Sequence, residues 1–430
     1  MTNKCSFSIW CISIIAITIF FSCNNKFSNT LFKGRSPHQQ YEQQLIAAGL
    51  NGSSLFKQWK NASKQSILQP ISITVPYQEE AYFAANNPNA VAFIFDARIG
   101  EKLQINLELQ TLDSTQLFID LFKMIEDTTE QQVAIYSADT RDSSLSYVIE
   151  DNDKYILRIQ PELLSDISYE LQITAEPSLG NPVEATAKQN IGSFFGDGRD
   201  AGSRKHEGID IFANRSTPAV AAANGIISRV GLNNLGGKIV FLKPEGLAIN
   251  LYYAHLDSQL VETGQTVSLG DTLGLIGNTG NARTTPPHLH FGIYTRQGAV
   301  DPIPFIRPGK SNPSKISVDT RRIGDTVRAS NSNNMINTPL IIEGAAMDNY
   351  RVILPDKSKT FVSQKQITTL NNQIKIISLN KAETLYSEPD SLSARIIKYP
   401  SGTKLTVIGE YNGFYLVNNK SIKGWIKQTI

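Results

Sequence analysis

Cysteine and histidine are both scarce in this chain of 430 residues, and both are confined to short stretches of it. All three cysteines, Cys5, Cys11 and Cys23, lie within the first 23 positions. If a leader is removed before Cys23, one cysteine remains and no internal disulfide can form. An exported protein of this kind would depend on core burial or on a metal for its stability. Four of the five histidines fall within one stretch of 85 residues, and this clustering indicates a functional site.

The chain also lacks an excess of either charge. Its 41 lysines and arginines nearly balance 39 aspartates and glutamates, which leaves a net charge of +2. Such a balance produces no field that would attract a polyanion, so no nucleic-acid partner is expected. Hydrophobic residues make up 41% and charged residues 19%, a composition that excludes a wholly disordered or collagen-like chain. At about 100–200 residues per domain, the length predicts several domains.

The amino terminus carries the features of an export signal. Lys4 precedes an apolar run at residues 9–21, which ends in Ser22 and Cys23 and is followed by a polar stretch. The run is shorter than the ~20 residues that span a membrane and is typical of the apolar region of a secretory signal. It resembles a bacterial lipoprotein signal, in which the cysteine after the cleavage site becomes the lipid-bearing first residue. We therefore predict a signal peptide at residues 1–22 and lipid attachment at Cys23. The alternatives are an uncleaved anchor helix, or secretion in which Cys23 has no role.

Two further segments precede the clustered histidines. Residues 23–66 are expected to form a tether with a short helical hairpin, because Leu55, Phe56 and Trp59 have helical spacing. Residues 67–178 alternate with period two instead, which predicts an antiparallel β-sandwich. The order of segments resembles the pre-peptidase sandwiches of secreted peptidases. A spacer without a ligand is an equal alternative to a binding role.

The C-terminal part of the chain contains an internal repeat. Tyr350 and Phe361 match Phe414 and Trp425 without a gap, with a polar turn between the two aromatic residues of each copy. The pattern resembles the closing hairpin of a bacterial SH3-like barrel, and the resemblance implies binding of cell-wall peptides. A rigid appendage is the alternative, because a fold alone does not give function. The linker and the two small barrels are predicted at residues 308–317, 318–370 and 376–430.

The clustered histidines are expected on strands. His288 and His290 are two residues apart, a spacing that separates side chains by about 200° on a helix but puts them on one face of a strand. Prolines just before His288 block a helix, and the alternating apolar residues that follow favour a strand whose other face is buried. His206 and Asp210 are four residues apart, and the glycine and β-branched residues around them favour a strand as well. His255 closes a further run that is typical of a strand.

These residue types are the ones that a catalytic zinc site requires. Such a site has three nitrogen or oxygen ligands and one open position for water, whose pKa the metal lowers toward neutrality. Histidines outside the ligand set can accept a proton or donate a hydrogen bond to a developing oxyanion. A lone His-x-x-x-Asp pair or a lone strand histidine usually has no such role, but their joint occurrence favours a hydrolytic metal site. Spacing alone does not decide which three residues bind the metal.

Five motifs in this region resemble, in sequence and order, the lysostaphin/LytM-type zinc metallopeptidases. They are His206-Glu-Gly-Ile-Asp-Ile-Phe, Thr217-Pro-Ala-Val-Ala-Ala, Tyr252-Tyr-Ala-His-Leu, Gly277-Asn-Thr-Gly and Pro287-His-Leu-His-Phe-Gly. The resemblance covers about a quarter of the chain and predicts a metallopeptidase domain with an antiparallel β-sheet at residues 185–307. It implies that one Zn²⁺ per chain is bound by His206, Asp210 and His290. It also implies that His255 and His288 form the catalytic pair.

The same resemblance implies the substrate, since members of that family cut peptide bonds in bacterial cell-wall peptidoglycan. We therefore expect a mainly β, multidomain chain that acts as an exported, lipid-anchored zinc endopeptidase. Within the catalytic pair we take His288 as the base, because His290 beside it fixes its approach to the metal. Two alternatives stay open: a non-catalytic or autoinhibited protein that binds the wall or activates an amidase, and a secreted peptidase acting on glycine-rich proteins. The fifth histidine, His38, is left without a role.

Overall fold

The structure is a computed structural model. It describes residues 34–110, 115–125, 133–138, 144–199, 202–307, 309, 312–331, 335–419 and 422–428. The predicted signal peptide and Cys23 lie outside the described residues. Among the helices that are described, none has the length and apolar character needed to cross a membrane. The expected fold class is confirmed, because the described chain is mainly β and its antiparallel strands are divided among several sheets.

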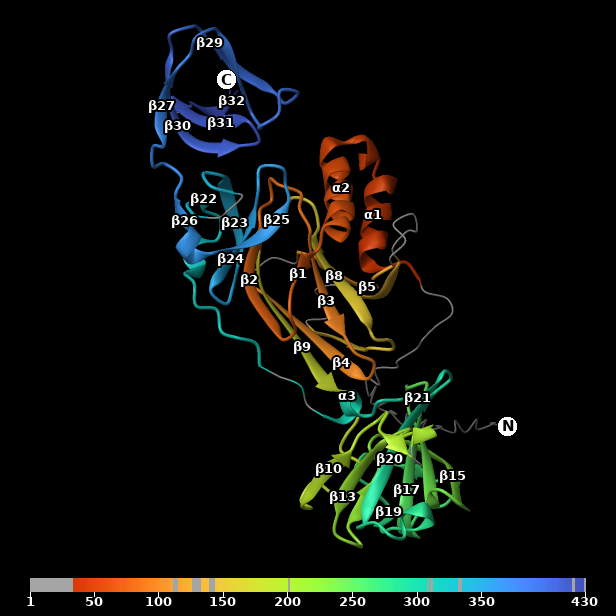
Figure 1. Cartoon of the computed structure of the whole chain (residues 1–430). Helices are drawn as coiled ribbons and strands as arrows, with labels where there is room; N and C mark the ends of the chain where they lie inside the picture. Colours follow the sequence, from red (N-terminus) through yellow and green to blue (C-terminus); the bar gives the residue numbers. More distant parts are fainter. Residues whose placement is uncertain are drawn as a thin grey trace, which may run out of the picture. The chain divides into compact units, whose positions relative to one another are not determined.

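Two helices open the described part of the chain (Figure 1). The first, α1 (Pro37–Ala47), begins with a capping box in which the side chains of Ser36 and Gln39 each accept a hydrogen bond from the other residue's amide. The second, α2 (Ser54–Leu68), is capped by the Ser53 side chain. A 3₁₀ turn, η1 (Leu50–Gly52), separates the two helices. The helical hairpin is therefore present, with its break at the expected glycine-rich position.

The next strands form two sheets that share one core. The first sheet has the order β1 (Ile71–Ser72), β3 (Val91–Ala97), β8 (Asp153–Pro161), β5 (Leu117–Lys123), β6 (Ala134–Ala138). The second contains β2 (Tyr77–Phe83), β9 (Ile167–Pro177), β4 (Glu101–Leu109) and β7 (Ser144–Val148). Leu103, Ile105 and Leu107 are buried on one face of β4, as the period-two alternation predicts, and the core cluster draws residues from both sheets.

The helices pack against the first sheet through an aromatic and polar interface. Trp59 of α2 is fully buried, and the imidazole of His38 stacks on it with 4.6 Å between ring centroids. The Nε2 atom of His38 lies 2.7 Å from Oε1 of Gln160 on β8. Nearby, Arg158 forms a buried ion pair with Asp120. His38 is thus an interface residue of the helical hairpin, which explains the one histidine that the sequence left without a role.

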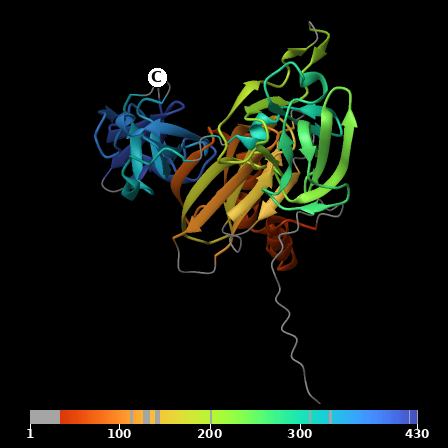
Figure 2. The ribbon, with the colours of Figure 1, turned by 90° about the horizontal axis from the view of Figure 1, so that it is seen from below.

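The segment with the four clustered histidines forms a ten-stranded sheet, drawn in green in Figures 1 and 2. Its main order is β10 (Gln189–Ser193), β13 (Ile209–Ala213), β20 (His288–Thr295), β17 (Asn250–Gln259), β16 (Gly237–Pro244), β15 (Gly225–Asn233), β18 (Thr266–Val267). Three further strands join it: β14 (Pro218–Val220), β19 (Thr272–Ile276) and β21 (Gly298–Val300). A separate two-stranded sheet consists of β11 (Gly198–Arg199) and β12 (Arg204–Lys205), and a short helix, α3 (Ile303–Ile306), follows β21.

The C-terminal strands, in which a pair of barrels is expected, are divided between two sheets. The first region contains β22 (Thr326–Ala329), β23 (Pro339–Ala346), β24 (Asn349–Ile353), β25 (Lys359–Ser363) and β26 (Ile367–Thr369). It belongs to the same sheet as β2, because β23 pairs antiparallel with β2. The second region is a six-stranded sheet with the order β27 (Lys375–Ser378), β30 (Lys404–Tyr411), β31 (Phe414–Asn419), β32 (Ile422–Lys427), β28 (Glu383–Tyr386), β29 (Arg395–Tyr399). Neither region forms a closed barrel among the described residues, so the SH3-like repeats stay a prediction.

Both hairpins of the internal repeat are present, but their registers differ by one residue. Tyr350 pairs with Val362 in the first copy. In the gapless match Val362 corresponds to Ile426, but in the second copy Phe414 pairs with Lys427 instead. The gapless sequence match therefore identifies the two hairpins correctly and does not reproduce their pairing.

A buried cluster of charges joins the first C-terminal region to the sandwich. Arg351 of β24 is fully buried, and its Nε atom lies 3.0 Å from Oε2 of Glu79 on β2, a residue 272 positions earlier. Its Nη1 atom donates to Oε2 of Glu343 at 3.0 Å. The hydroxyls of Tyr77 and Tyr169 donate to Glu79, which satisfies the rest of that carboxylate. Because every charge in this cluster has a partner, removing one of them would leave another buried and unpaired.

We predict that Arg351→Met lowers the free energy of unfolding by about 3–5 kcal/mol, since it leaves Glu79 as an unpaired buried charge. The matched control is Arg321→Met, because Arg321 pairs with Asp319 while 89% of its side chain is exposed. That control should cost less than about 1 kcal/mol. Urea unfolding of both variants measures the difference, and equal losses would contradict the role given to the buried cluster.

His38 makes the docking of the helical hairpin sensitive to acid. Burial and the nearby Arg158 guanidinium lower the pKa of His38 to about 4, whereas an unfolded histidine has a pKa of about 6.5. The folded state therefore binds fewer protons than the unfolded state between these two values. The stability that neutral His38 contributes is fully present above pH 6.5 and is lost as the pH falls toward 4.

We predict that hydrogen exchange in α1 and α2 reports an opening free energy about 2 kcal/mol smaller at pH 5 than at pH 7, after correction for intrinsic exchange rates. His38→Gln, which keeps a hydrogen-bonding side chain without a titrating group, should remove most of this difference. An equal loss in the variant would assign the acid sensitivity to other groups.

Candidate metal centre

The register of three neighbouring strands brings the predicted site residues together. Asp210 on β13 pairs with His290 on β20, and His290 pairs with Ala254 on β17. His255 therefore follows directly after a residue that faces His290. His288 lies two residues before His290 on the same strand face, as its spacing predicts. Asp210, His255, His288 and His290 line one pocket.

His206 lies outside the strand on which it was expected. The strand β13 begins at Ile209, three residues later, and the backbone of His206 is instead hydrogen-bonded to the turn at residues 196–197. Gly208 makes this approach possible, because a Cβ atom there would lie 2.5 Å from the carbonyl oxygen of Phe291 and 2.9 Å from the imidazole of His290. The chain can thus bring His206 beside His290 only with glycine at position 208.

Three donor atoms converge on one point. Nε2 of His206 lies 2.9 Å from Nδ1 of His290 and 3.1 Å from Oδ1 of Asp210, and Nδ1 of His290 lies 3.0 Å from the same oxygen. Among the described residues, His206, Asp210 and His290 are the group that could hold a metal ion, and we call these three residues the donor group. A carboxylate oxygen and two imidazole nitrogens this close repel one another unless a proton or a cation lies between them.

The donor set suits zinc in type and spacing. Zinc takes imidazole nitrogen and carboxylate oxygen at about 2.0–2.2 Å, and a tetrahedral arrangement places such ligand atoms about 3.3 Å apart. The observed separations of 2.9–3.1 Å are close to that value. Three protein donors leave the fourth tetrahedral position for water or substrate, as in catalytic rather than structural zinc sites.

Backbone carbonyls orient three of the four imidazoles. In His206 the Nδ1 atom lies 2.9 Å from the carbonyl oxygen of Phe194. In His255 it lies 2.8 Å from the carbonyl oxygen of Thr279. In His288 it lies 2.9 Å from the carbonyl oxygen of Pro286. Since a carbonyl only accepts, each of these Nδ1 atoms carries the proton and donates it. The lone pair is therefore on Nε2 in each ring. This is the tautomer that a metal ligand or a proton acceptor needs.

His255 is held in an unusual backbone conformation. Its φ of 61° lies in the left-handed region, which non-glycine residues rarely adopt. Its amide donates to the carbonyl oxygen of Gly236, while its imidazole donates to that of Thr279. These two contacts come from different loops and together fix the ring beside His288, with 4.9 Å between the two ring centroids. Such strained positions are typical of functional sites.

Burial and charge set the protonation states of the site. Burial raises the pKa of Asp210, but its contacts with the imidazoles of His206 and His290 outweigh this effect and hold that pKa well below its usual range. Burial lowers the pKa of His290. Burial, together with the neighbouring imidazoles of His288 and His290, lowers the pKa of His255 to about 4. An ionised Asp210 beside a neutral His290 is the state in which both can bind a cation.

Arg199 is a site residue that the sequence did not reveal. Its Nη2 atom donates to Oδ2 of Asp210 at 2.8 Å and to the Ser193 hydroxyl at 2.6 Å. It thereby occupies the carboxylate oxygen that does not face the histidines, leaving Oδ1 for the donor group. Arg199 comes from the two-residue strand β11, which has too few residues to show any periodic pattern. No local signal could have identified it.

An aromatic floor extends from the donor group across the sheet. We use this name for Tyr252 of β17 and Phe241 of β16, whose ring centroids are 4.7 Å apart. The ring of Tyr252 also meets that of His290 edge to face at 5.7 Å. Burial raises the pKa of Tyr252, and a hydrogen bond from Asn233 and the positive charge of Arg229 oppose that rise. Tyr252 lies in a motif of the resemblance, but the motif gave it no role.

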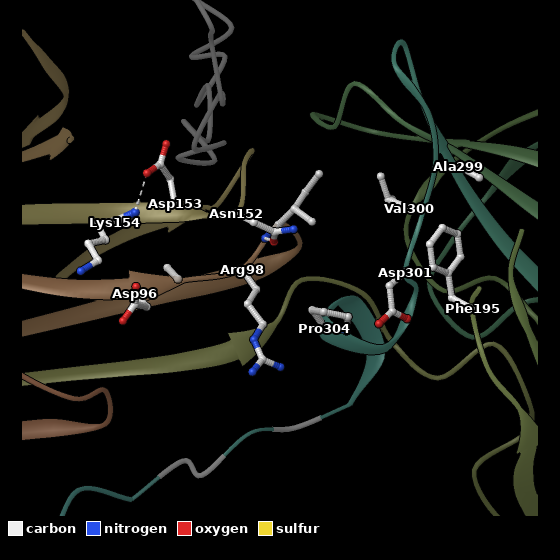
Figure 3. Close-up of a pocket in the computed structure, with 12 residues that line it drawn as sticks. Asp96, Arg98, Asn152, Asp153, Lys154, Phe195, Ala299, Val300, Asp301 and Pro304 are labelled. Carbon is white, nitrogen blue, oxygen red and sulfur yellow. Dashed lines mark hydrogen bonds between the residues drawn. The ribbon is translucent and has the colours of Figure 1, made fainter. Parts of the chain in front are cut away.

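The donor group, His255, His288 and the aromatic floor line one pocket of about 830 Å³. A second pocket, of about 820 Å³, is shown in Figure 3 and involves Asp96, Arg98, Asn152 and Asp301. Its lining contains neither histidine nor cysteine. The residue types that a metal-dependent hydrolase requires line the first pocket.

Comparisons with known proteins agree with this assignment. Residues 204–302 match Peptidase family M23. The chain is similar to the L-Ala–D-Glu endopeptidase of Bacillus subtilis, with 33% identity over 138 residues that cover 29% of this chain and 42% of that protein. It is also similar to the uncharacterized lipoprotein YgeR of Escherichia coli, with 38% identity over 109 residues that cover 25% of this chain and 42% of that one.

A solved structure is also similar to part of this chain. The catalytic domain of lysostaphin from Staphylococcus simulans is 32% identical, with 28% of this chain and 91% of that chain covered and a TM-score of 0.25. The chain spans less than half the length of the curated relatives it matches. The family match, by contrast, contains all five predicted metal and catalytic residues. Residues 204–302 are thus a Peptidase M23 domain within a longer chain.

Proposed function

We propose that this chain is an exported zinc-dependent endopeptidase that hydrolyses peptide bonds of bacterial cell-wall peptidoglycan. The observation that carries the proposal is the convergence of Nε2 of His206, Oδ1 of Asp210 and Nδ1 of His290 within 3.1 Å of one another. These three atoms would hold one Zn²⁺ per chain. The wall as substrate is supported by the similarity to two proteins of Vibrio cholerae that are named peptidoglycan DD-endopeptidases.

When bound, zinc would supply a Lewis acid that polarises the scissile carbonyl and lowers the pKa of water. His288 is the proposed base, because its Nε2 lone pair lies 3.9 Å from Oδ1 of Asp210, beside the donor group. It accepts a proton at Nε2 from the attacking water. It then returns that proton to the amine that leaves, as general acid–base catalysis requires.

His255 has a complementary role in the proposal. With a pKa of about 4 it is neutral near pH 7, and its Nε2 is an acceptor because Nδ1 donates to Thr279. It would hold the second proton of the attacking water and so fix the direction of attack. Two acceptors on one side of the donor group orient the nucleophile more narrowly than one.

Export and a lipid anchor complete the proposal. Residues 1–22 would be removed as a signal peptide, and Cys23 would carry the lipid that holds the protein to a bacterial membrane. The similarity to a protein named as a lipoprotein supports this placement. A tethered enzyme would meet its wall substrate at the membrane surface, where the helical hairpin and the sandwich separate the anchor from the peptidase domain along the chain.

We predict that Asp210→Asn lowers zinc from one ion per chain to well below half occupancy, because the amide lacks the charge and the second lone-pair oxygen of the carboxylate. The matched control is Asp96→Asn, since Asp96 is exposed on β3 and lies in the other pocket. Metal analysis after dialysis gives the stoichiometry. Full zinc in both variants would contradict the proposed ligand set.

Hydrolysis of the wall is tested with purified sacculi and mass spectrometry of the released muropeptides. His288→Ala should keep its zinc and lose activity by about 10²–10⁴-fold, because the loss is that of a general base. Stoichiometric zinc in the wild type without new muropeptides from several types of sacculus would reject the enzyme. That result would leave the wall-binding or amidase-activating alternative.

A further inference from the structure

One row of residues crosses the active face of the sheet from the donor group to its far side. Arg229 on β15 pairs with Phe241 on β16, Phe241 pairs with Tyr252 on β17, and Tyr252 pairs with Gly292 on β20. Directly opposed residues of antiparallel strands project to the same face. Arg229 therefore stands at the far end of the aromatic floor, on the face that carries His290, and lines the same pocket.

The Arg229 side chain is exposed, and the described residues provide it with no hydrogen bond and no ion pair. Its guanidinium lies along its own strand over Gly231, where a Cβ atom would be 3.5 Å from Nε. The two acidic residues that line the pocket have other partners. Asp210 contacts Arg199 and the histidines, and Glu207 accepts a hydrogen bond from the Tyr294 hydroxyl. The positive charge of Arg229 is thus available to a ligand in the pocket.

The distance along this row suits a peptide. Neighbouring strands lie about 4.8 Å apart, so the backbones of β20 and β15 are separated by about 14 Å. That is the length of about four residues of extended chain. Since an arginine side chain spans the length of one to two residues of extended chain, its partner would lie two to four residues from the bond at the donor group.

We propose that Arg229 is a specificity-determining residue, which selects acidic peptides by binding a substrate carboxylate two to four residues from the scissile bond. The peptide backbone crosses the strands over the aromatic floor, and the guanidinium forms a charge-assisted hydrogen bond with that carboxylate. Neutral segments such as polyglycine would lack this contact. The inference rests on the proposed peptidase function and narrows its substrate class.

The test compares soluble muropeptides from muramidase-digested sacculi, untreated or with their carboxylates converted to carboxamides by carbodiimide and ammonium. The zinc-loaded full chain is assayed as wild type, Arg229→Gln, Arg229→Lys and the control Arg296→Gln. Arg296 is exposed in the turn between β20 and β21 and does not line the pocket. We expect the wild type and the control to cleave the untreated muropeptides with kcat/KM about tenfold higher than the amidated ones.

In Arg229→Gln this ratio should fall to near one, because kcat/KM falls for the untreated muropeptides and stays the same for the amidated ones. Arg229→Lys should retain part of the preference. Equal ratios in the wild type and Arg229→Gln would overturn the proposal. Calorimetric binding of both muropeptide sets to His255→Ala, with and without Arg229→Gln, separates recognition from turnover. If His255→Ala binds the untreated muropeptides more tightly than the amidated ones, and the wild type hydrolyses neither set, the proposed peptidase activity is rejected. The proposed recognition of a carboxylate by Arg229 is then retained. Equal binding of the two sets would reject that role whether or not hydrolysis occurs.

Discussion

The pairing of β13 with β20 is the constraint on which the site depends. It places Asp210 opposite His290, so that two ligand-type side chains project from adjacent strands to the same face. A shift of one residue in this register would turn one of the two side chains to the buried face, because side chains alternate along a strand. The register is held by the core beneath it, where Ile209, Ile211, Leu289 and Phe291 are all buried. The apolar side of the two strands thus fixes the geometry of the polar side.

Loops and turns then supply what the strands alone do not. His206 reaches the donor group from a turn, and Gly208 removes the side chain that would block it. Carbonyl groups of Phe194, Thr279 and Pro286 set the tautomers of three imidazoles, which leaves their Nε2 lone pairs directed into the pocket. Arg199 occupies the outer oxygen of Asp210. The site residues are therefore oriented by neighbours outside the donor group, an arrangement that is usual for metal centres.

Local patterns predicted much of this, and long-range contacts account for the rest. The two-residue spacing of His288 and His290, with prolines before it, was enough to predict a strand with both imidazoles on one face. The resemblance supplied the grouping of these residues with His206, Asp210 and His255, and the structure brings all five into one pocket. The prediction that His206 lies within the strand was wrong: His206 precedes the strand, and the role of Gly208 in bringing it beside His290 depends on a strand more than 80 residues later.

Arg199 and the pairing of β23 with β2 left no local pattern in the sequence, because each depends on segments that meet only in the folded chain. The buried pairing of Arg351 with Glu79 has the same origin, and it makes the first C-terminal region part of the sandwich sheet rather than an independent unit of the topology. The peptidase segment is therefore inserted in the sequence between two parts of one sheet. The role of His38 could likewise not be predicted from the sequence, because its partners are Trp59 and a glutamine 122 residues later.

The central claim is that His206, Asp210 and His290 form a single zinc site with one open position. Anomalous diffraction at the zinc edge, from crystals of the zinc-loaded full chain, tests it most directly. The account predicts one strong peak per chain, about 2.0–2.2 Å from Nε2 of His206, Oδ1 of Asp210 and Nδ1 of His290. A peak at another place, or a zinc ion bound by His255 or His288 in place of one of these three residues, would contradict it.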